Sequence, residues 1–533
     1  MPRTAQLLIA LLAAAAAIGA ASAQDADVPT GSHDYVAYPD EPAVTHHTVT
    51  INGEAIHYEA TAGTVTHVDE SRDPTARMFY IAYRRTLMSA ADHASAVANA
   101  EARGETAPRR YPDAADRPVT FSFNGGPGSS SVWLHLGIFG PKRVAYADDK
   151  GNPGPPPYAV IDNAHSLLDH SDFVFIDPIS TGFSRAEVDG DPKSFHGVEP
   201  DIASVGEFIR RYITTEERWR SPRFVAGESY GTTRAAGLAE HLFERHGIAL
   251  NGMLLISSVM QFQTLRFDTG NDLPYILILP GYTATAWYHG ALADREQGMP
   301  LEDLLAEVED FALGEYASAL LQGDRLTERE HREIVAKVAR YTGLEPEYVE
   351  RANLRVSQSR FGKELLRDQG LTVGRLDSRF TARDRDNAGE RNEFDPSYSA
   401  ILGNYTGSLN SYVREDLAYE SDLPYEILTN VWPWEFAQGG NNRYLDVAER
   451  LRSAMHQVPG MRVFIASGYY DLATPFTATD HTLAQMMLAD EYKPLIDVEY
   501  YESGHMMYVH QPSLEKLKRD LDTWYESAIP NRD

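Results

Sequence analysis

The most informative segment of the sequence is Phe224-Val225-Ala226-Gly227-Glu228-Ser229-Tyr230-Gly231. Its apolar start is typical of a short buried strand, and the following Thr233–His246 has a helical pattern that Gly247 ends. A G-x-S-x-G sequence between a strand and a helix is typical of a tight turn that projects a serine hydroxyl above the end of a sheet. Such a turn needs small residues on both sides of the serine. We therefore predict Ser229 as a nucleophile, with an ordinary turn serine as the alternative reading.

Short apolar segments that end in Gly or Asp recur along the chain, and helical patterns separate them. This alternation predicts parallel βα units and thus a mostly parallel central sheet. The predicted strands are Val119–Phe123, Phe173–Ile176, Phe224–Ala226, Met253–Ile256, Val463–Ala466 and Val498–Tyr501, and the closing helix runs from Pro512 to about Ala528. Before them, alternating apolar and polar residues flank Asn52-Gly53, which predicts a hairpin. An N-terminal antiparallel extension of the sheet is expected.

The segment between Ile256 and Val463 shows several helical patterns but no comparable series of strands. It interrupts the α/β pattern and is expected to form a cap beside the site. We predict a core in two parts, residues 24–260 and 436–533, with residues 261–435 as a large, mainly helical cap insertion.

A weak serine nucleophile needs a base, and the base needs an acid that orients it. The strand at Val463–Ala466 leads into Asp471, and the strand at Val498–Tyr501 leads into Gly504-His505. Serine, aspartate and histidine in this order, at the ends of successive strands, are the arrangement of α/β-hydrolases. The sequence thus predicts an α/β-hydrolase fold with catalytic Ser229, Asp471 and His505. A surface histidine and a capping aspartate are the competing readings.

The glycine-rich run Asn124–Ser131 follows the first parallel strand. Glycines let backbone N–H groups turn toward a ligand, so this run is a candidate oxyanion loop. We assign the oxyanion hole to the N–H groups of Gly126 and of Tyr230, the residue after the nucleophile. A phosphate-binding loop is the rival interpretation. It fails because no Lys follows at the required spacing and Pro127 removes a donor.

Composition limits the partners and the chemistry. The 533 residues carry 48 Lys+Arg against 77 Asp+Glu, a net charge of −29, with no basic block longer than a pair, which argues against nucleic acid. There are no cysteines, so disulfides, thiolate metal sites and cysteine nucleophiles are excluded. We expect no cofactor and no metal. There is no H-E-x-x-H motif, and Asp384–Gly389 only approximates a calcium loop.

The N-terminus has the pattern of a secretory signal. Arg3 precedes an apolar run from Leu7 to Ile18, and Ala21-Ser22-Ala23 stands before Gln24. A membrane anchor is the alternative, but the run is shorter than the ~20 residues that span a bilayer. We predict cleavage of residues 1–23 and a periplasmic or secreted protein with no membrane attachment afterwards.

Five motifs together resemble the serine carboxypeptidases, peptidase family S10, in a bacterial-type form. They are Asn124–Ser131, Asp177–Arg185, Gly227–Gly231, Gly468–Asp471 and Gly504–His505. The resemblance implies an α/β-hydrolase with a helical cap, a Ser229–His505–Asp471 triad, and release of C-terminal residues from peptides, usually at acidic pH. It also implies that Asn124, Gly125 and Glu228 bind the substrate carboxylate. A carboxylate facing Glu228 would share a proton with it, which favours acidic conditions.

The sequence departs from the family pattern at several positions. Ser122 stands where family members often carry tryptophan, and Ile138 stands where the second acid of the carboxylate site is expected. Arg234 replaces a usual tyrosine and is open to two readings, a substrate contact or a structural salt bridge. These departures keep a second function open. The leading prediction is an exported serine carboxypeptidase, and the alternative is an esterase or acyltransferase with the same fold and triad.

Overall fold

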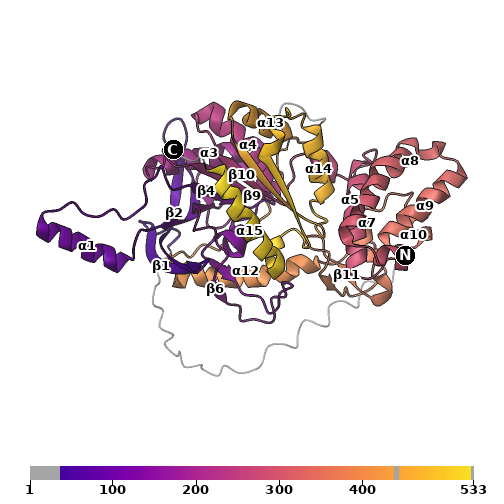
Figure 1. Ribbon diagram of the computed structural model, residues 1–533, viewed down its shortest axis with the longest axis horizontal. Helices are drawn as coiled ribbons and strands as arrows, with labels where there is room; N and C mark the ends of the chain where they lie inside the picture. Colours follow the sequence, from indigo (N-terminus) through magenta and orange to yellow (C-terminus); the bar gives the residue numbers. More distant parts are fainter. Residues whose placement is uncertain (1–35, 437–442, 530–533) are drawn as a thin grey trace, which may run out of the picture.

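A 10-stranded sheet runs through the computed structural model, which describes residues 36–436 and 443–529 (Figure 1). Its first three strands are antiparallel: β1 (Ala43–Ile51), β2 (Glu54–Val68) and β3 (Pro74–Arg85). Asn52 and Gly53 join β1 to β2 with φ of 50° and 81°. These values suit the tight turn that an Asn-Gly pair favours. The predicted hairpin and the antiparallel extension are confirmed.

Six parallel strands continue the sheet from β3, and every strand predicted from an apolar segment is among them. In spatial order they are β7 (Asp172–Ile176), β4 (Val119–Phe123), β9 (Arg223–Glu228), β10 (Gly252–Ile256), β13 (Arg462–Gly468) and β14 (Ile496–Tyr501). The predicted strands match these within one or two residues at each end. The short tenth strand, β8 (Arg185–Ala186), pairs with β3 in the antiparallel direction. The α/β-hydrolase fold is therefore confirmed, with a sheet that is parallel apart from β8 and its N-terminal extension.

Both faces of the sheet are covered because successive side chains of a strand point to opposite sides. In β9, Val225 packs with helices α3 (Val198–Thr215), α4 (Tyr230–His246) and α13 (Ala448–Gln457). Its neighbours Phe224 and Ala226 pack on the other face, with α2 (Val132–Leu134), η1 (His135–Phe139), α12 (Pro396–Glu415) and α15 (Gln511–Ala528). Burial on both faces explains why these strands are continuously apolar in sequence.

The segment between β10 and β13 contains two kinds of element. One set of helices shares a separate hydrophobic cluster: α5 (Leu273–Tyr288), α7 (Leu301–Phe311), α8 (Ala317–Gln322), α9 (Glu328–Thr342), α10 (Pro346–Arg351) and α11 (Gln358–Glu364). Figure 1 shows α5 and α7–α10 beside the sheet, beyond its β14 side. Helix α12, in contrast, packs into the main core through Tyr405, Leu409 and Tyr412. The segment therefore contributes both to a cap and to one face of the sheet.

The predicted signal segment, residues 1–23, lies outside the described residues. Among the described residues, no helix combines the length and the apolar character needed to cross a membrane.

A buried charge cluster joins four parts of the core. Asp172, at the start of β7, is buried and accepts from Arg117 Nε at 2.8 Å and from a terminal nitrogen of Arg218 at 2.6 Å. It also accepts the backbone N–H of Arg85, at 3.0 Å. Both guanidinium groups are nearly inaccessible to water. The carboxylate therefore pairs with two cations that solvent cannot screen and offsets part of their charge.

We predict that Asp172→Ala lowers the free energy of unfolding by about 3–5 kcal/mol, because it leaves two buried cations without their partner. Urea denaturation measures the change. The control is Asp497→Ala, which removes a partly exposed pair with Arg462 and is expected to cost less than about 1 kcal/mol. Equal losses in the two variants would contradict the importance of the buried cluster.

Candidate active site

Ser229 lies at a strained turn between β9 and α4, with φ 59° and ψ −129°. A non-glycine residue rarely adopts a positive φ, and such strain persists only where the surroundings enforce it. Here they do so by close backbone contact. A Cβ on Gly227 would lie 2.2 Å from the Gly231 carbonyl oxygen, and one on Gly231 would lie 2.8 Å from that of Phe123. The two glycines of the motif are therefore required by the geometry of the turn.

His505 and Asp471, which follow β14 and β13, form a hydrogen-bonded pair. His505 Nδ1 lies 2.7 Å from Asp471 Oδ2. The fully buried Asp471 also accepts the backbone N–H groups of Ala473 and Thr474 and the Thr474 hydroxyl. Burial opposes a charge on the ring, but the adjacent carboxylate outweighs it and raises the pKa of His505 above its ordinary value. With Nδ1 engaged, Nε2 is the nitrogen left for Ser229.

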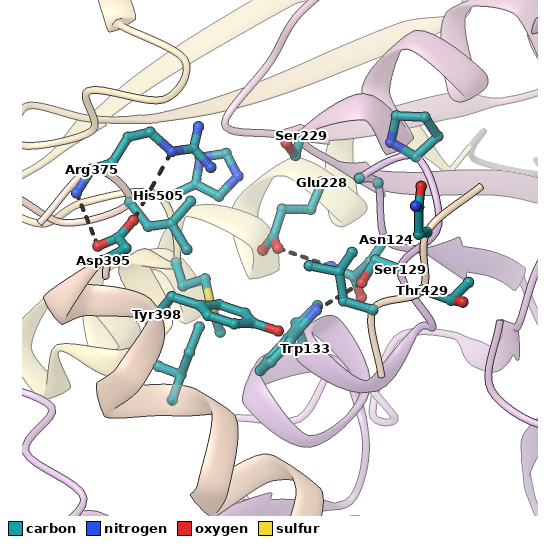
Figure 2. Close-up of a pocket in the computed structure, with 18 of the residues that line it drawn as sticks. Asn124, Ser129, Trp133, Glu228, Ser229, Arg375, Asp395, Tyr398, Thr429 and His505 are labelled. Atoms are coloured by element: carbon teal, nitrogen blue, oxygen red, sulfur yellow. Dashed lines mark hydrogen bonds and ion pairs between the residues drawn. The ribbon is translucent and has the colours of Figure 1, made fainter. Parts of the chain in front are cut away.

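A cavity of about 620 Å³ opens on Ser229 and His505 (Figure 2). Asn124, Gly125, Gly126 and Glu228 line the same cavity, so every residue assigned from the sequence to the triad or the substrate except the buried Asp471 borders it. Much of the remaining lining is apolar and comes from Trp133, Leu376, Tyr398, Ile401 and Met506. Trp133 lies just beyond the candidate oxyanion loop, Asn124–Ser131.

Glu228 and Asn124 form a buried polar pair beside Ser229. Asn124 Nδ2 donates to Glu228 Oε1 at 2.8 Å, and the Tyr508 hydroxyl donates to Glu228 Oε2 at 2.5 Å. Burial raises the pKa of Glu228 to about 7, although nearby His505 and the two hydrogen bonds oppose the shift. Glu228 therefore holds a proton over most of the acidic range. A neutral carboxyl can donate a hydrogen bond, which a carboxylate cannot.

The backbone around the proposed oxyanion hole is tightly packed. A Cβ on Gly125 would lie 2.4 Å from the Tyr230 amide nitrogen, so the glycine-rich loop passes directly against the start of α4. Gly126 lines the cavity with φ 105°, a value that favours glycine. Tyr230 is the first residue of α4, where N–H groups have no partner within the helix. Gly126 and Ser229 thus border the same cavity, and Tyr230 directly follows Ser229.

Arg234 does not border the cavity. It is almost fully buried, and its Nε lies 2.8 Å from Asp201 Oδ2. One terminal nitrogen donates to the backbone oxygen of Asn124 at 2.6 Å. Of the two readings left open by the sequence, the geometry supports the structural ion pair. Its effect is to hold the backbone of Asn124 in place.

The other two departures from the family pattern, Ser122 and Ile138, also lie in the protein core. Ser122, in β4, and Ile138, in η1, are both fully buried, and neither is among the residues that line the cavity in the described part of the chain. Because residue 138 is an isoleucine, no acid at this position can pair with Glu228. Tyr508 instead occupies the second oxygen of that carboxyl. No sequence motif marks Tyr508, because it lies within a short 3-10 helix, Met507–Val509, that matches no recognised pattern.

A loop of the inserted segment holds the turn that carries His505. The His505 N–H donates to Leu376 O at 2.6 Å, and the Gly504 N–H donates to Asp377 Oδ2 at 3.1 Å. Arg379 pairs with Asp377 at 2.6 Å and donates to Ser503 Oγ at 3.0 Å. No sequence pattern predicted these contacts, because no motif in the loop marks it as a neighbour of the last strand.

A nucleophilic serine at a strained strand-to-helix turn, followed in the chain by an aspartate and a histidine at the ends of later strands, defines an α/β-hydrolase. The family model described as serine carboxypeptidase (Peptidase_S10) matches residues 107–511. The chain belongs to this family, and it is a hydrolase of the serine peptidase class.

Several solved structures are similar to this chain at low sequence identity. A carboxyl esterase from Bacillus coagulans in complex with glycerol is 12% identical, with 88% of this chain and 99% of that chain covered and a TM-score of 0.33. A soluble variant of monoglyceride lipase from Saccharomyces cerevisiae is 9% identical, with 88% and 97% covered and a TM-score of 0.34. A comparison with curated proteins found no match.

We predict that Asp377→Ala lowers kcat for Ser229-dependent ester hydrolysis by about tenfold or more, because a displaced catalytic group is costly even when the shift is about 1 Å. Steady-state kinetics measure the change. The control is Asp384→Ala, which breaks a comparably buried pair with Lys363 in the same inserted segment. It is expected to reduce stability but not kcat of the folded fraction. Equal kcat losses would contradict a specific effect on His505.

Proposed function

We propose that the protein is a serine carboxypeptidase that releases C-terminal amino acids from peptides through an acyl-enzyme. His505 takes the proton of the Ser229 hydroxyl as the oxygen attacks the scissile carbonyl, and Asp471 keeps the imidazole oriented. The N–H groups of Gly126 and Tyr230 stabilise the oxyanion. His505 then protonates the leaving amine, and water hydrolyses the acyl-enzyme by the reverse sequence of proton transfers.

The observation that carries this proposal is the buried Glu228–Asn124 pair beside the nucleophile. A peptide's terminal carboxylate can share the proton of Glu228 and accept from the Asn124 amide, with Gly125 alongside. Two carboxyl groups that share one proton attract, whereas two carboxylates repel. The pair thus favours a substrate with a free C-terminus over one whose end is blocked.

This arrangement gives the reaction a definite pH dependence. Glu228, with its pKa near 7, loses its proton as the pH rises through neutrality, and recognition of the carboxylate is lost with it. His505 has to be neutral to act as a base, so its protonation limits the reaction on the acid side. We propose that these two groups set the optimum, which lies close to neutral pH because the pKa of His505 is also raised above its ordinary value.

An esterase or acyltransferase remains the second candidate, because the same acyl-enzyme forms from an ester and can react with another nucleophile. The buried Ile138 favours this candidate, since it leaves Glu228 without a second acid. The two functions differ in whether a free C-terminal carboxylate speeds the reaction.

We predict that an N-blocked dipeptide is cleaved and that its C-terminal amide is cleaved at least about tenfold more slowly, since a charge-assisted contact contributes about 1.5–3 kcal/mol. Amino-acid release between pH 4 and 8 measures both rates, with Ser229→Ala as the blank. The kcat/KM for the free acid is expected to fall as the pH rises through 7, whereas that for a matched ester should lack this decline.

Glu228→Gln provides the matched variant. Glutamine has nearly the shape of glutamate, but its amide group does not titrate. The decline near pH 7 should therefore disappear, and discrimination against the C-terminally amidated substrate should shrink. If only simple esters are cleaved, in a Ser229-dependent way, the esterase or acyltransferase assignment replaces the carboxypeptidase one. An alkaline decline that is identical for acid and ester would exclude Glu228 as its source.

We further propose that the protein is exported, on the strength of the N-terminal signal pattern alone. Expression of the full chain in a Gram-negative host should give a mature protein that begins at Gln24. N-terminal sequencing of the periplasmic fraction measures this. Replacing the apolar Leu11-Leu12 by two aspartates should keep the uncleaved chain in the cytoplasm, and an uncleaved chain in the native case would contradict the proposal.

A further inference from the structure

Arg375 borders the cavity but has no role in the reaction proposed for Ser229 and His505. It lies between β11 (Thr372–Val373) and α12, next to the loop that holds the His505 turn. Among the described residues that line the cavity, it is the only Lys or Arg, and its side chain is 53% exposed. Figure 2 shows it beside His505, across the cavity from Asn124. It therefore adds a positive charge at the end away from the proposed carboxylate-binding pair.

The backbone of Arg375 is fixed, but its guanidinium is only weakly engaged. Its N–H donates to Asp395 Oδ1 at 3.1 Å, and its carbonyl accepts from Leu472 N–H at 3.1 Å. The side chain reaches Asp395 Oδ2 only at 4.0 Å. Asp395 Oδ1 is committed to the start of α12, where it accepts the N–H of Ser397. A guanidinium carries five donors, so Arg375 retains most of them for another partner.

We propose that Arg375 binds a side-chain carboxylate of the substrate, so that the enzyme prefers peptides with an acidic residue next to the scissile bond. This inference rests on the proposed carboxypeptidase function, in which Glu228 and Asn124 already hold the terminal carboxylate. Arg375 is then free for a second acidic group. The planar guanidinium matches the two oxygens of a carboxylate, and the partial exposure of the site keeps the desolvation cost low.

Either residue that flanks the scissile bond can bring its side chain to this position. The leaving amine lies against His505, beside Arg375, so the released residue is one source of the carboxylate. The preceding residue, bound to Ser229 in the acyl-enzyme, is the other. Arg375 also borders a smaller cavity of about 210 Å³, next to Leu472 and Pro475, which gives room for a longer side chain on that side.

The test compares N-blocked peptides that differ only as Glu against Gln, in one pair at the last residue and in a second pair at the residue before it. At pH 6 the glutamate side chain is ionised. We expect kcat/KM to favour Glu by about fivefold in at least one pair, the effect of an ion pair of about 1 kcal/mol. The ratio should fall to near one in Arg375→Gln, remain partly in Arg375→Lys, and shrink in high salt.

Asp395→Asn gives a change of opposite sign. Asparagine caps a helix as well as aspartate does, so the start of α12 is kept while the competing carboxylate is removed. The Glu/Gln ratio should therefore rise above that of the native enzyme. The matched control is Arg385→Gln, which removes an exposed cation elsewhere in the inserted segment and should leave the ratio unchanged. A purely structural effect of the loop would not move the ratio in opposite directions.

Three results would overturn the inference: a native ratio near one in both pairs, a ratio unchanged by Arg375→Gln, or an equal loss for Glu and Gln peptides in that variant. The pair that responds identifies the source of the carboxylate. If the native enzyme cleaves no peptide, the proposed function fails, and N-blocked Glu and Gln methyl esters then test the cation at the acyl residue. If Arg375→Gln abolishes a preference for the Glu ester, the inference is supported. If the variant leaves that preference unchanged, the inference is overturned.

Discussion

The tight turn at Ser229 constrains most of the active site. Its positive φ is maintained because β4 and the start of α4 approach the turn so closely that side chains at Gly227, Gly231 and Gly125 would collide with backbone atoms. The same contacts put the glycine-rich loop against the Tyr230 amide. A single steric arrangement thus positions Ser229, the proposed nucleophile, and the loop proposed to supply a backbone donor. The parallel sheet supplies the rigid support that such strain requires.

Burial then sets the electrostatics of the cavity. Glu228 is almost inaccessible to water, which favours its neutral form, while Asp471 favours the charged form of His505. Each group lies within the electrostatic reach of the other, so a charge on one stabilises the opposite charge on the other. The protonation of Glu228 and the basicity of His505 are therefore linked. The hydrogen bonds from Asn124 and Tyr508 to Glu228, and the one between Asp471 and His505, set the balance between the two protonation states.

The sequence predicted those parts of the structure that depend on local patterns. Apolar runs on a sheet buried on both faces, an Asn-Gly hairpin and a serine turn flanked by glycines follow from short-range rules. The strands and the hairpin hold within a residue or two, and Ser229 lies at such a turn. Tyr508, Asp377 and Arg375 could not be found in this way. Tyr508 and Asp377 contact residues distant in the chain, and Arg375 reaches the cavity only through the fold. No repeating pattern marks such contacts. Arg234 shows the same limit, since only its burial beside Asp201 separates a structural role from a substrate contact.

The core and the inserted segment contribute different parts of the active site. The groups proposed to make and break bonds lie at the ends of core strands or just after them, where the sheet fixes them. The loop at residues 375–379 comes from the insertion, yet it accepts the His505 N–H through Leu376 and presents Arg375 to the same cavity. Support of the histidine and the surface that meets the substrate are therefore parts of one short loop. A change there that alters the substrate preference also risks displacing the base, and this coupling limits how freely the insertion can vary without loss of catalysis.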